Sequence, residues 1–248
     1  MKLTACSRLA ERFNLTDFAY AHRGLWTADG PTENSLEAFL IAAEHGLGIE
    51  FDVRPSSDGV PIVFHDPELD RMTSETGATE DRSATELIGL RLKSSGEIIS
   101  LEQLLEAWPA TTPLLCEMKV DGQTDPEAFC RTVAALMSEH NGPAAMMSFS
   151  AEAVAAIPDS IMRGQLIAPS RGHHSKSLAQ TASVLVDYFA CHTSDAKSAS
   201  LQAVRGDQPL ITWTVMDAAT CMDLAAFTDS QIFEGFDPAL AKRHISNT

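Results

Sequence analysis

Short strand-like segments alternate with helix-like segments along most of the chain, a pattern typical of an α/β protein. The predicted strands are Phe18–His22, Gly48–Val53, Val60–His65, Pro113–Lys119, Ala145–Phe149, Gly164–Ala168, Val184–His192 and Pro209–Val215. The predicted helices are Asn34–His45, Leu101–Trp108, Pro126–His140, Ala151–Ile157, Ser175–Ala182, Ser194–Val204 and Ala218–Phe227.

Eight strands that alternate with helices over 248 residues predict a (β/α)8 TIM barrel. The second and third predicted strands are too close in sequence for a helix between them, so the predicted barrel lacks one helix at that point. Residues 66–100 are polar and rich in turn residues, which indicates a small insertion after the third strand. No repeat or interdomain linker is evident, and we expect residues 1–248 to form a single TIM-barrel domain.

The segment Asn34–His45 carries the best-supported helix signal. Asn34 is a residue type that favours the N-cap, and Glu37 stands at the spacing of a capping box. From Leu36 onward, apolar residues recur at i, i+3, i+4 and i+7, which places them on one helix face. Gly46 then supplies a C-terminal stop.

The composition excludes several classes of partner. No apolar run approaches the ~20 residues of a membrane span, so no stable membrane insertion is expected. The formal net charge of −16 argues against nucleic acids and anionic membranes, and an anionic substrate would need local positive charge. Five scattered cysteines without a C-x-x-C pair suggest reduced thiols and a cytoplasmic location. The oligomeric state stays open, a homo-oligomer included.

Glu50 and Asp52 interrupt the otherwise apolar predicted strand Gly48–Val53. Residues two apart on a strand share a face, so the two carboxylates point the same way, roughly 7 Å apart. Glu117 and Lys119 repeat this spacing on the fourth predicted strand, and barrel strands converge on one mouth. Converging carboxylates repel one another, and their oxygens are the ligands of hard cations. We therefore expect Glu50, Asp52 and Glu117 to hold one divalent metal ion, Mg²⁺ or Ca²⁺.

Basic residues near these acids could form ion pairs with them or bind an anionic substrate. Arg23, Arg54 and Lys119 could instead neutralise the carboxylates as ion pairs, with no metal ion. Arg23 and Lys119 would also supply the positive charge that an anionic substrate needs, because a guanidinium can bind two phosphate oxygens at once.

His22 and His65 end two predicted strands. Imidazole titrates near neutral pH, so we expect the two histidines to act as general acid and general base, with the assignment left open. The chain contains neither a G-x-S-x-G motif nor a P-loop. The pattern therefore favours a metal-assisted displacement at phosphorus over serine chemistry.

Several spaced motifs give the chain a resemblance to the glycerophosphodiester phosphodiesterase family. They are AHRG (21–24), ENSLEAF (33–39), IEFDVRPSSDGVPIVFHD (49–66), LDRMTSETG (69–77), CEMK (116–119) and WTV (213–215). The resemblance implies a barrel with an insertion and metal-dependent hydrolysis of small-molecule glycerophosphodiesters to glycerol 3-phosphate and an alcohol such as choline or ethanolamine. It implies the same roles for the residues above: His22 and His65 as acid and base, Glu50, Asp52 and Glu117 as metal ligands, Arg23 and Lys119 for the phosphate.

Two features bear on the alcohol rather than on the reaction. The segment IFEGFDP (232–238) departs from the family's usual Ile-Thr-Asp/Asn-x-Pro, because Glu234 and Phe236 alter the mouth of the barrel. Trp213 is expected to bind substrate by stacking on a glycerol or a cationic head group, with packing at the barrel top as the alternative. His173 and His174 indicate an exposed polar loop more than a second metal site.

Two other functions fit the same barrel. One is a phosphodiesterase for lysophospholipids or phosphoinositides, although the polar insertion favours a soluble head-group diester over a lipid. The other is a non-catalytic protein that binds phosphorylated ligands. Retention of both histidines and all three acids favours an enzyme.

Overall fold

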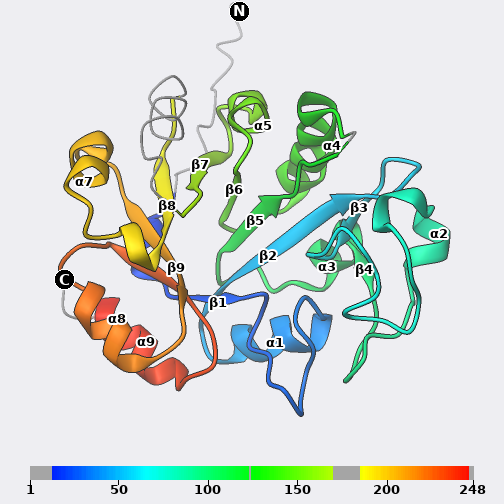
Figure 1. The fold of residues 1–248 in the computed structure, drawn as a ribbon, viewed down its shortest axis with the longest axis horizontal. Helices are drawn as coiled ribbons and strands as arrows, with labels where there is room; N and C mark the ends of the chain where they lie inside the picture. The colour runs from blue at the N-terminus through cyan, green and yellow to red at the C-terminus, as the bar shows by residue number, and fades with distance from the viewer. Residues whose placement is uncertain (1–12, 123, 170–184, 246–248) are drawn as a thin grey trace, which may run out of the picture.

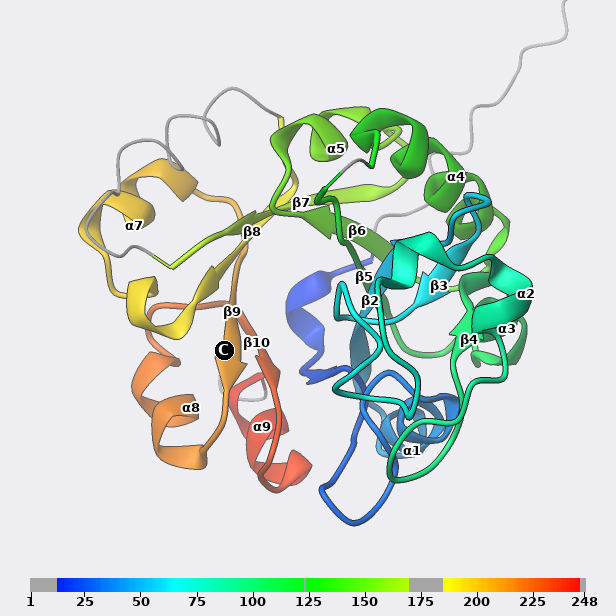
Figure 2. The ribbon, with the colours of Figure 1, turned by 45° about the vertical axis from the view of Figure 1, so that its right-hand side comes forward.

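In the computed structural model, which describes residues 13–122, 124–169 and 185–245, eight parallel strands close into a barrel (Figures 1 and 2). The barrel strands are β1 (Tyr20–His22), β2 (Gly48–Pro55), β5 (Leu114–Met118), β6 (Ala144–Ser148), β7 (Met162–Ile167), β8 (Tyr188–His192), β9 (Leu210–Val215) and β10 (Ser230–Phe233). Because β1 pairs with both β2 and β10, the sheet has no open edge between them. The predicted TIM barrel is confirmed.

The helices lie outside the barrel, and all of them except the last, which follows β10, stand between successive barrel strands (Figure 1). They are α1 (Leu36–Glu44), α3 (Leu101–Ala107), α4 (Pro126–Glu139), α5 (Ala151–Ala156), α7 (Ala199–Arg205), α8 (Ala218–Leu224) and α9 (Pro238–Ile245). Short 3₁₀ turns, η1 (Leu15–Asp17) and η3 (Thr193–Asp195), precede β1 and follow β8. The predicted helix Ser175–Ala182 and the pair His173 and His174 lie outside the described residues. Within the described segments, no helix is long and apolar enough to cross a membrane.

The prediction that Val60–His65 forms the third barrel strand is wrong. β3 (Pro61–Val63) runs antiparallel to β2 and also pairs with the short β4 (Ile99–Ser100), outside the ring of parallel strands. The connection from β2 to β3 is too short for a crossover, so the chain can only return as a hairpin. The eighth barrel strand is instead β10, which was not among the predicted strands.

No barrel helix is missing between β2 and the next barrel strand, because α3 lies between β2 and β5. The predicted gap came from counting β3 as a barrel strand. The polar segment between β3 and β4 contains η2 (Thr79–Asp81) and the one-turn α2 (Ala84–Leu87). It encloses a small apolar cluster of its own, made of Ile62, Phe64, Leu69, Ala84, Leu87, Leu92 and Ile98.

The start of α1 also differs from the prediction. Ser35, not Asn34, is the N-cap, and its hydroxyl accepts a hydrogen bond from the Ala38 N–H at 3.3 Å. Asn34 has a positive φ of 56°, and its side chain is directed to Asp52. The residue type expected to cap the helix is therefore used inside the barrel mouth.

Large and small side chains alternate between neighbouring strands inside the barrel. The register sets Gly48 of β2 beside Tyr20 of β1, and Gly164 of β7 beside Tyr188 of β8. Both tyrosines are fully buried. A Cβ at Gly164 would lie 2.2 Å from Cζ of Tyr188, so the glycine is needed for the ring to fit.

We expect Gly164→Ala to lower the free energy of unfolding by about 1–3 kcal/mol, because overpacking forces the Tyr188 ring or the backbone to move. Urea unfolding followed by circular dichroism measures this. Tyr188→Leu removes the ring atoms that the new methyl group would meet, so in that background Gly164→Ala should cost clearly less. An equal cost in both backgrounds would disprove the clash.

Candidate functional site

The residues singled out in the sequence meet at the carboxyl ends of the barrel strands. Strand pairing sets His22 beside Glu50, and Asp52 beside Glu117. A cavity of about 250 Å³ opens there. It is lined by His22, Arg23, Glu50, His65, Glu117, Lys119, Met147, Phe149, Leu166, Trp213, Thr214 and Ile232. Every predicted site residue except Asp52 is thus part of the lining, and Asp52 lies next to Glu117.

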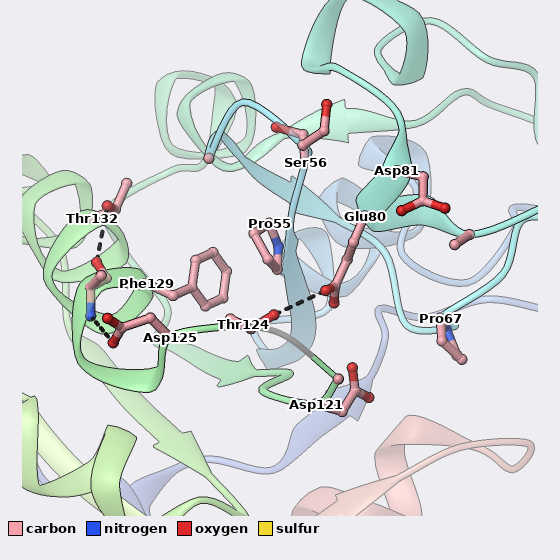
Figure 3. Close-up of a pocket in the computed structure, with 15 residues that line it drawn as sticks. Pro55, Ser56, Pro67, Glu80, Asp81, Asp121, Thr124, Asp125, Phe129 and Thr132 are labelled. Carbon is pink, nitrogen blue, oxygen red and sulfur yellow. Dashed lines mark hydrogen bonds between the residues drawn. The ribbon is translucent and has the colours of Figure 1, made fainter.

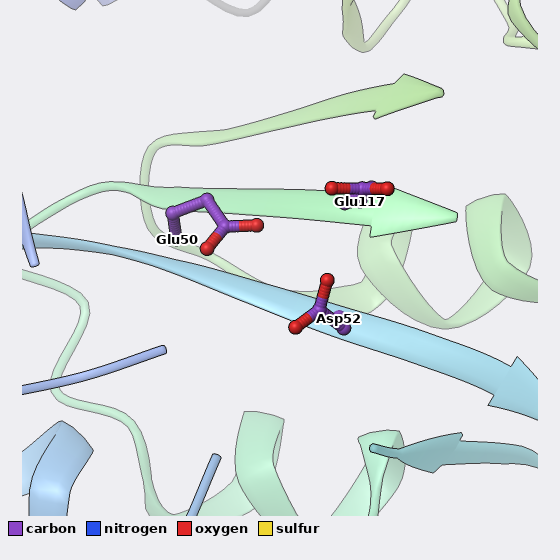
Figure 4. A group of neighbouring side chains, drawn as sticks. All are labelled: Glu50, Asp52 and Glu117. Atoms are coloured by element: carbon purple, nitrogen blue, oxygen red, sulfur yellow. The ribbon is translucent and has the colours of Figure 1, made fainter. Parts of the chain in front are cut away.

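The three acids form a compact, buried triad. Glu50 and Asp52 project from β2 and Glu117 from β5, on the same side of the sheet (Figure 4). One carboxylate oxygen from each lies within 4.8 Å of the others, and the residues are only 2%, 1% and 7% exposed. Burial, together with the charges of Asp52 and Glu117, raises the pKa of Glu50 well above its usual range. Such a set of hard oxygen donors fits a divalent cation.

Lys119 and Arg23 neutralise part of this charge. Lys119 Nζ lies 3.0 Å from Asp52 Oδ1 and 2.5 Å from Glu117 Oε1, and Arg23 Nε lies 3.3 Å from Asp52 Oδ2. Although burial alone would raise the pKa of Asp52, these two cations lower it below its usual range. Asp52 and Glu117 therefore form ion pairs with these cations, although burial still raises the pKa of Glu117.

Glu50 is less well compensated than the other two acids. Its Oε2 accepts from the backbone N–H of Arg23 at 3.3 Å and lies 3.9 Å from His22 Nε2. Arg54 does not contribute, because its guanidinium binds both carboxylate oxygens of Asp121, at 2.8 and 3.0 Å. Ion pairs alone thus leave excess negative charge at the triad, which a cation would offset.

Each predicted catalytic histidine has a carboxylate on Nδ1. His22 Nδ1 lies 2.6 Å from Glu234 Oε2, and His65 Nδ1 lies 2.6 Å from Asp66 Oδ1. Burial and the nearby cations of Lys119 and Arg23 lower the pKa of His65 despite the attraction of Asp52. With Nδ1 engaged, Nε2 is the nitrogen of each ring that is left for a ligand in the cavity.

Several residues support the site although the sequence analysis gave them no role in it. Asn34 Nδ2 donates to Asp52 Oδ2 at 2.9 Å. Glu33 accepts from Arg23 at 2.8 Å and from Arg71, a residue of the insertion, at 2.6 Å. Glu33 and Asn34 belong to a motif quoted above, but a local pattern could only suggest a helix cap.

Trp213 lies where the sequence analysis expected it, at the mouth of the barrel, and its stacking on a substrate stays a prediction. It lines the cavity, and it packs edge-to-face against Phe149 and His192, with ring centroids 5.7 and 5.3 Å away. The cavity therefore has a charged side on β1, β2 and β5 and a largely apolar side on β6, β7, β9 and β10.

A second hollow lies beside the barrel mouth, between the insertion and α4 (Figure 3). This groove has a volume of about 600 Å³, and its lining includes Glu80, Asp81, Asp121 and Asp125. Arg54 is bonded to the first and third of these acids but leaves an excess of negative charge. Such a surface repels phosphate, so the smaller cavity is the candidate site for an anionic substrate.

Known proteins resemble this chain in sequence over limited segments. A human protein named glycerophosphodiester phosphodiesterase 1 is 47% identical over 60 residues, which cover 24% of this chain and 18% of that protein. The probable glycerophosphodiester phosphodiesterase 2 of Mycobacterium tuberculosis is 37% identical over 92 residues, or 37% of this chain and 34% of that protein. The matched segments thus span well under half of these relatives.

Solved structures match over nearly the whole chain. An Oleispira antarctica phosphodiesterase in complex with the product sn-glycerol-3-phosphate superposes with a TM-score of 0.76 at 22% identity, covering 93% of this chain and 97% of that one. A glycerophosphodiester phosphodiesterase from Parabacteroides distasonis gives the same TM-score at 20% identity, with the same coverage. At this identity the likeness establishes the fold.

The most extensive sequence match is to a family rather than to one protein. The model of the glycerophosphoryl diester phosphodiesterase family matches residues 22–221, which include His22, His65 and the whole acidic triad. This chain therefore belongs to the glycerophosphoryl diester phosphodiesterase family.

Proposed function

We propose that the protein hydrolyses glycerophosphodiesters to glycerol 3-phosphate and an alcohol in a reaction that requires one divalent metal ion. The observation that carries this proposal is the convergence of His22, His65 and the acidic triad on one cavity. Membership of the family and the product named in the Oleispira structure support it.

The electrostatics of the cavity support an anionic substrate. The chain carries a net charge of −16, so a phosphodiester needs local attraction. Arg23 and Lys119 line the cavity and supply two positive charges there, and we assign the phosphate to them. Their present contacts with the acids leave other N–H groups of both side chains for phosphate oxygens.

The size of the cavity supports a small diester. A volume of about 250 Å³ lies below the usual range for drug-sized ligands, roughly 300–1,000 Å³. The acyl chain of a lysophospholipid would have to lie outside this cavity. We therefore favour head-group diesters, with Trp213 and Phe149 contacting the glycerol or the alcohol.

The side chains divide the work of hydrolysis. Glu50, Asp52 and Glu117 would hold the metal ion. When bound, the ion would offset charge on the phosphoryl oxygens and activate the attacking group, a glycerol hydroxyl or water. One of the histidines accepts the proton from the attacking hydroxyl, and the other donates a proton to the departing alkoxide. Arg23 and Lys119 hold the phosphate between them.

The decisive assay is release of glycerol 3-phosphate from glycerophosphocholine, with chelator and with Mg²⁺ or Ca²⁺ restored. We expect turnover to disappear with chelator and to return with metal. Failure with every metal on the choline, ethanolamine and glycerol diesters would reject the proposal. Release from a lysophospholipid alone would then favour the lipid substrate, and binding without turnover would favour a non-catalytic role.

Metal binding can be tested without turnover. We expect Mg²⁺ or Ca²⁺ to raise the melting temperature of the chelated protein, because a ligand that binds only the folded state stabilises it. Glu50→Gln removes one donor and should abolish this shift while the protein still folds. Glu44→Gln, an exposed change on α1, is the control and should keep the wild-type shift. An undiminished shift in Glu50→Gln would place the metal elsewhere.

Replacing His22 or His65 should lower kcat far more than replacing a histidine outside the cavity. We expect His22→Ala and His65→Ala to lower kcat by roughly 10²- to 10⁴-fold, the usual contribution of general acid–base catalysis. His45→Ala changes an exposed residue at the end of α1 and should leave kcat within about twofold of wild type. Steady-state kinetics at saturating metal measure this, and near-normal kcat in either cavity variant would contradict its assigned role.

A further inference from the structure

Glu234 reaches His22 because of the way in which the barrel closes. β10 pairs with β1 so that Tyr20 faces Ile232 and Ala21 faces Phe233. Continued by one residue, this register sets Glu234 beside His22, and both side chains turn to the barrel interior. The backbone N–H of Glu234 donates to the carbonyl of Val215 on β9 at 3.0 Å, which fixes its position from the other side.

The contact between the two side chains is short and sheltered. Glu234 Oε2 lies 2.6 Å from His22 Nδ1, and the side chains are 15% and 16% exposed. Burial would raise the pKa of Glu234, but the hydrogen bond and charge of His22 lower it, so the carboxylate is ionised near neutral pH. An ionised carboxylate accepts hydrogen bonds only, so His22 must carry its proton on Nδ1.

The partner of the other histidine is shared. Asp66 accepts from His65, and it also accepts from Nε and Nη2 of Arg71 at 2.5 and 3.0 Å. The Asp66 carboxylate therefore accepts hydrogen bonds from both an imidazole and a guanidinium. Among the described residues, Glu234 makes no hydrogen bond to a second cationic side chain, so its effect is concentrated on His22.

We propose that Glu234 is a positioning residue for His22. Its carboxylate holds the Nδ1–H, fixes the ring and directs Nε2 toward the acidic triad, where Nε2 lies 3.9 Å from Glu50 Oε2. This inference rests on the proposed function, in which His22 moves a proton. It also offers a reason why the segment IFEGFDP (232–238), which contains Glu234, differs from the family's usual sequence.

Kinetics of three variants test the proposal. Glu234→Ala should lower kcat for glycerophosphocholine by roughly 10- to 100-fold with KM within about threefold, because a free ring loses part of its acid–base contribution. Glu234→Gln should recover most of kcat, because an amide oxygen still accepts from Nδ1–H. Asp237→Asn removes a charge from the same segment, where Asp237 accepts from Ala239 N–H, and should match wild type. An unchanged kcat in Glu234→Ala, with an active wild type, would overturn the inference.

The tautomer of His22 gives a readout that does not depend on turnover. Long-range ¹H–¹⁵N correlation spectra at about pH 8.5, where a free imidazole is neutral, should show His22 protonated on Nδ1 in the wild type. The spectrum of His22→Gln assigns the signal. Glu234→Ala should shift the population toward Nε2–H, and an unchanged tautomer would overturn the proposal. An inactive wild type would reject the proposed function, while this spectrum would still decide whether Glu234 orients His22.

Discussion

The burial of three carboxylates at one mouth of the barrel is the constraint on which the surrounding structure depends. Removing an ionised carboxylate from water is costly unless it is paired or coordinates a metal ion. Lys119 and Arg23 meet this requirement for Asp52, whose pKa they lower, whereas burial keeps the pKa of Glu50 and of Glu117 raised. The proposed binding of a divalent cation would offset the negative charge that the ion pairs leave.

Several polar contacts around the triad hold those charges in place. Asn34 fixes Asp52, and Glu33 holds Arg23 while it also binds Arg71 of the insertion. Arg71 in turn binds Asp66, the partner of His65. A continuous chain of charged groups therefore connects the triad to the insertion, so the insertion takes part in placing one of the two histidines.

The division of the cavity into a charged and an apolar side accounts for how so acidic a chain can take an anion. Positive charge is concentrated just after β1 and β5, where we propose that the phosphate binds, while the described residues of the opposite wall, which include Phe149 and Trp213, carry no further acids. The strongly acidic groove beside the mouth cannot compete for the same ligand. Local placement, rather than net charge, decides what this site attracts.

Strand periodicity is a local property of the sequence. It was enough to determine that Glu50 and Asp52 share one face of their strand and that Glu117 and Lys119 share one face of theirs. The alternation of strands and helices was enough to predict the parallel barrel that brings the two strands together. The direction of β3, the eighth strand β10 and the use of Asn34 on Asp52 depended on tertiary pairing, so the sequence predicted them wrongly or not at all. The contact between His22 and Glu234 joins residues 212 positions apart. No local pattern encodes such a pair, because its register exists only once the last strand has closed the barrel against the first.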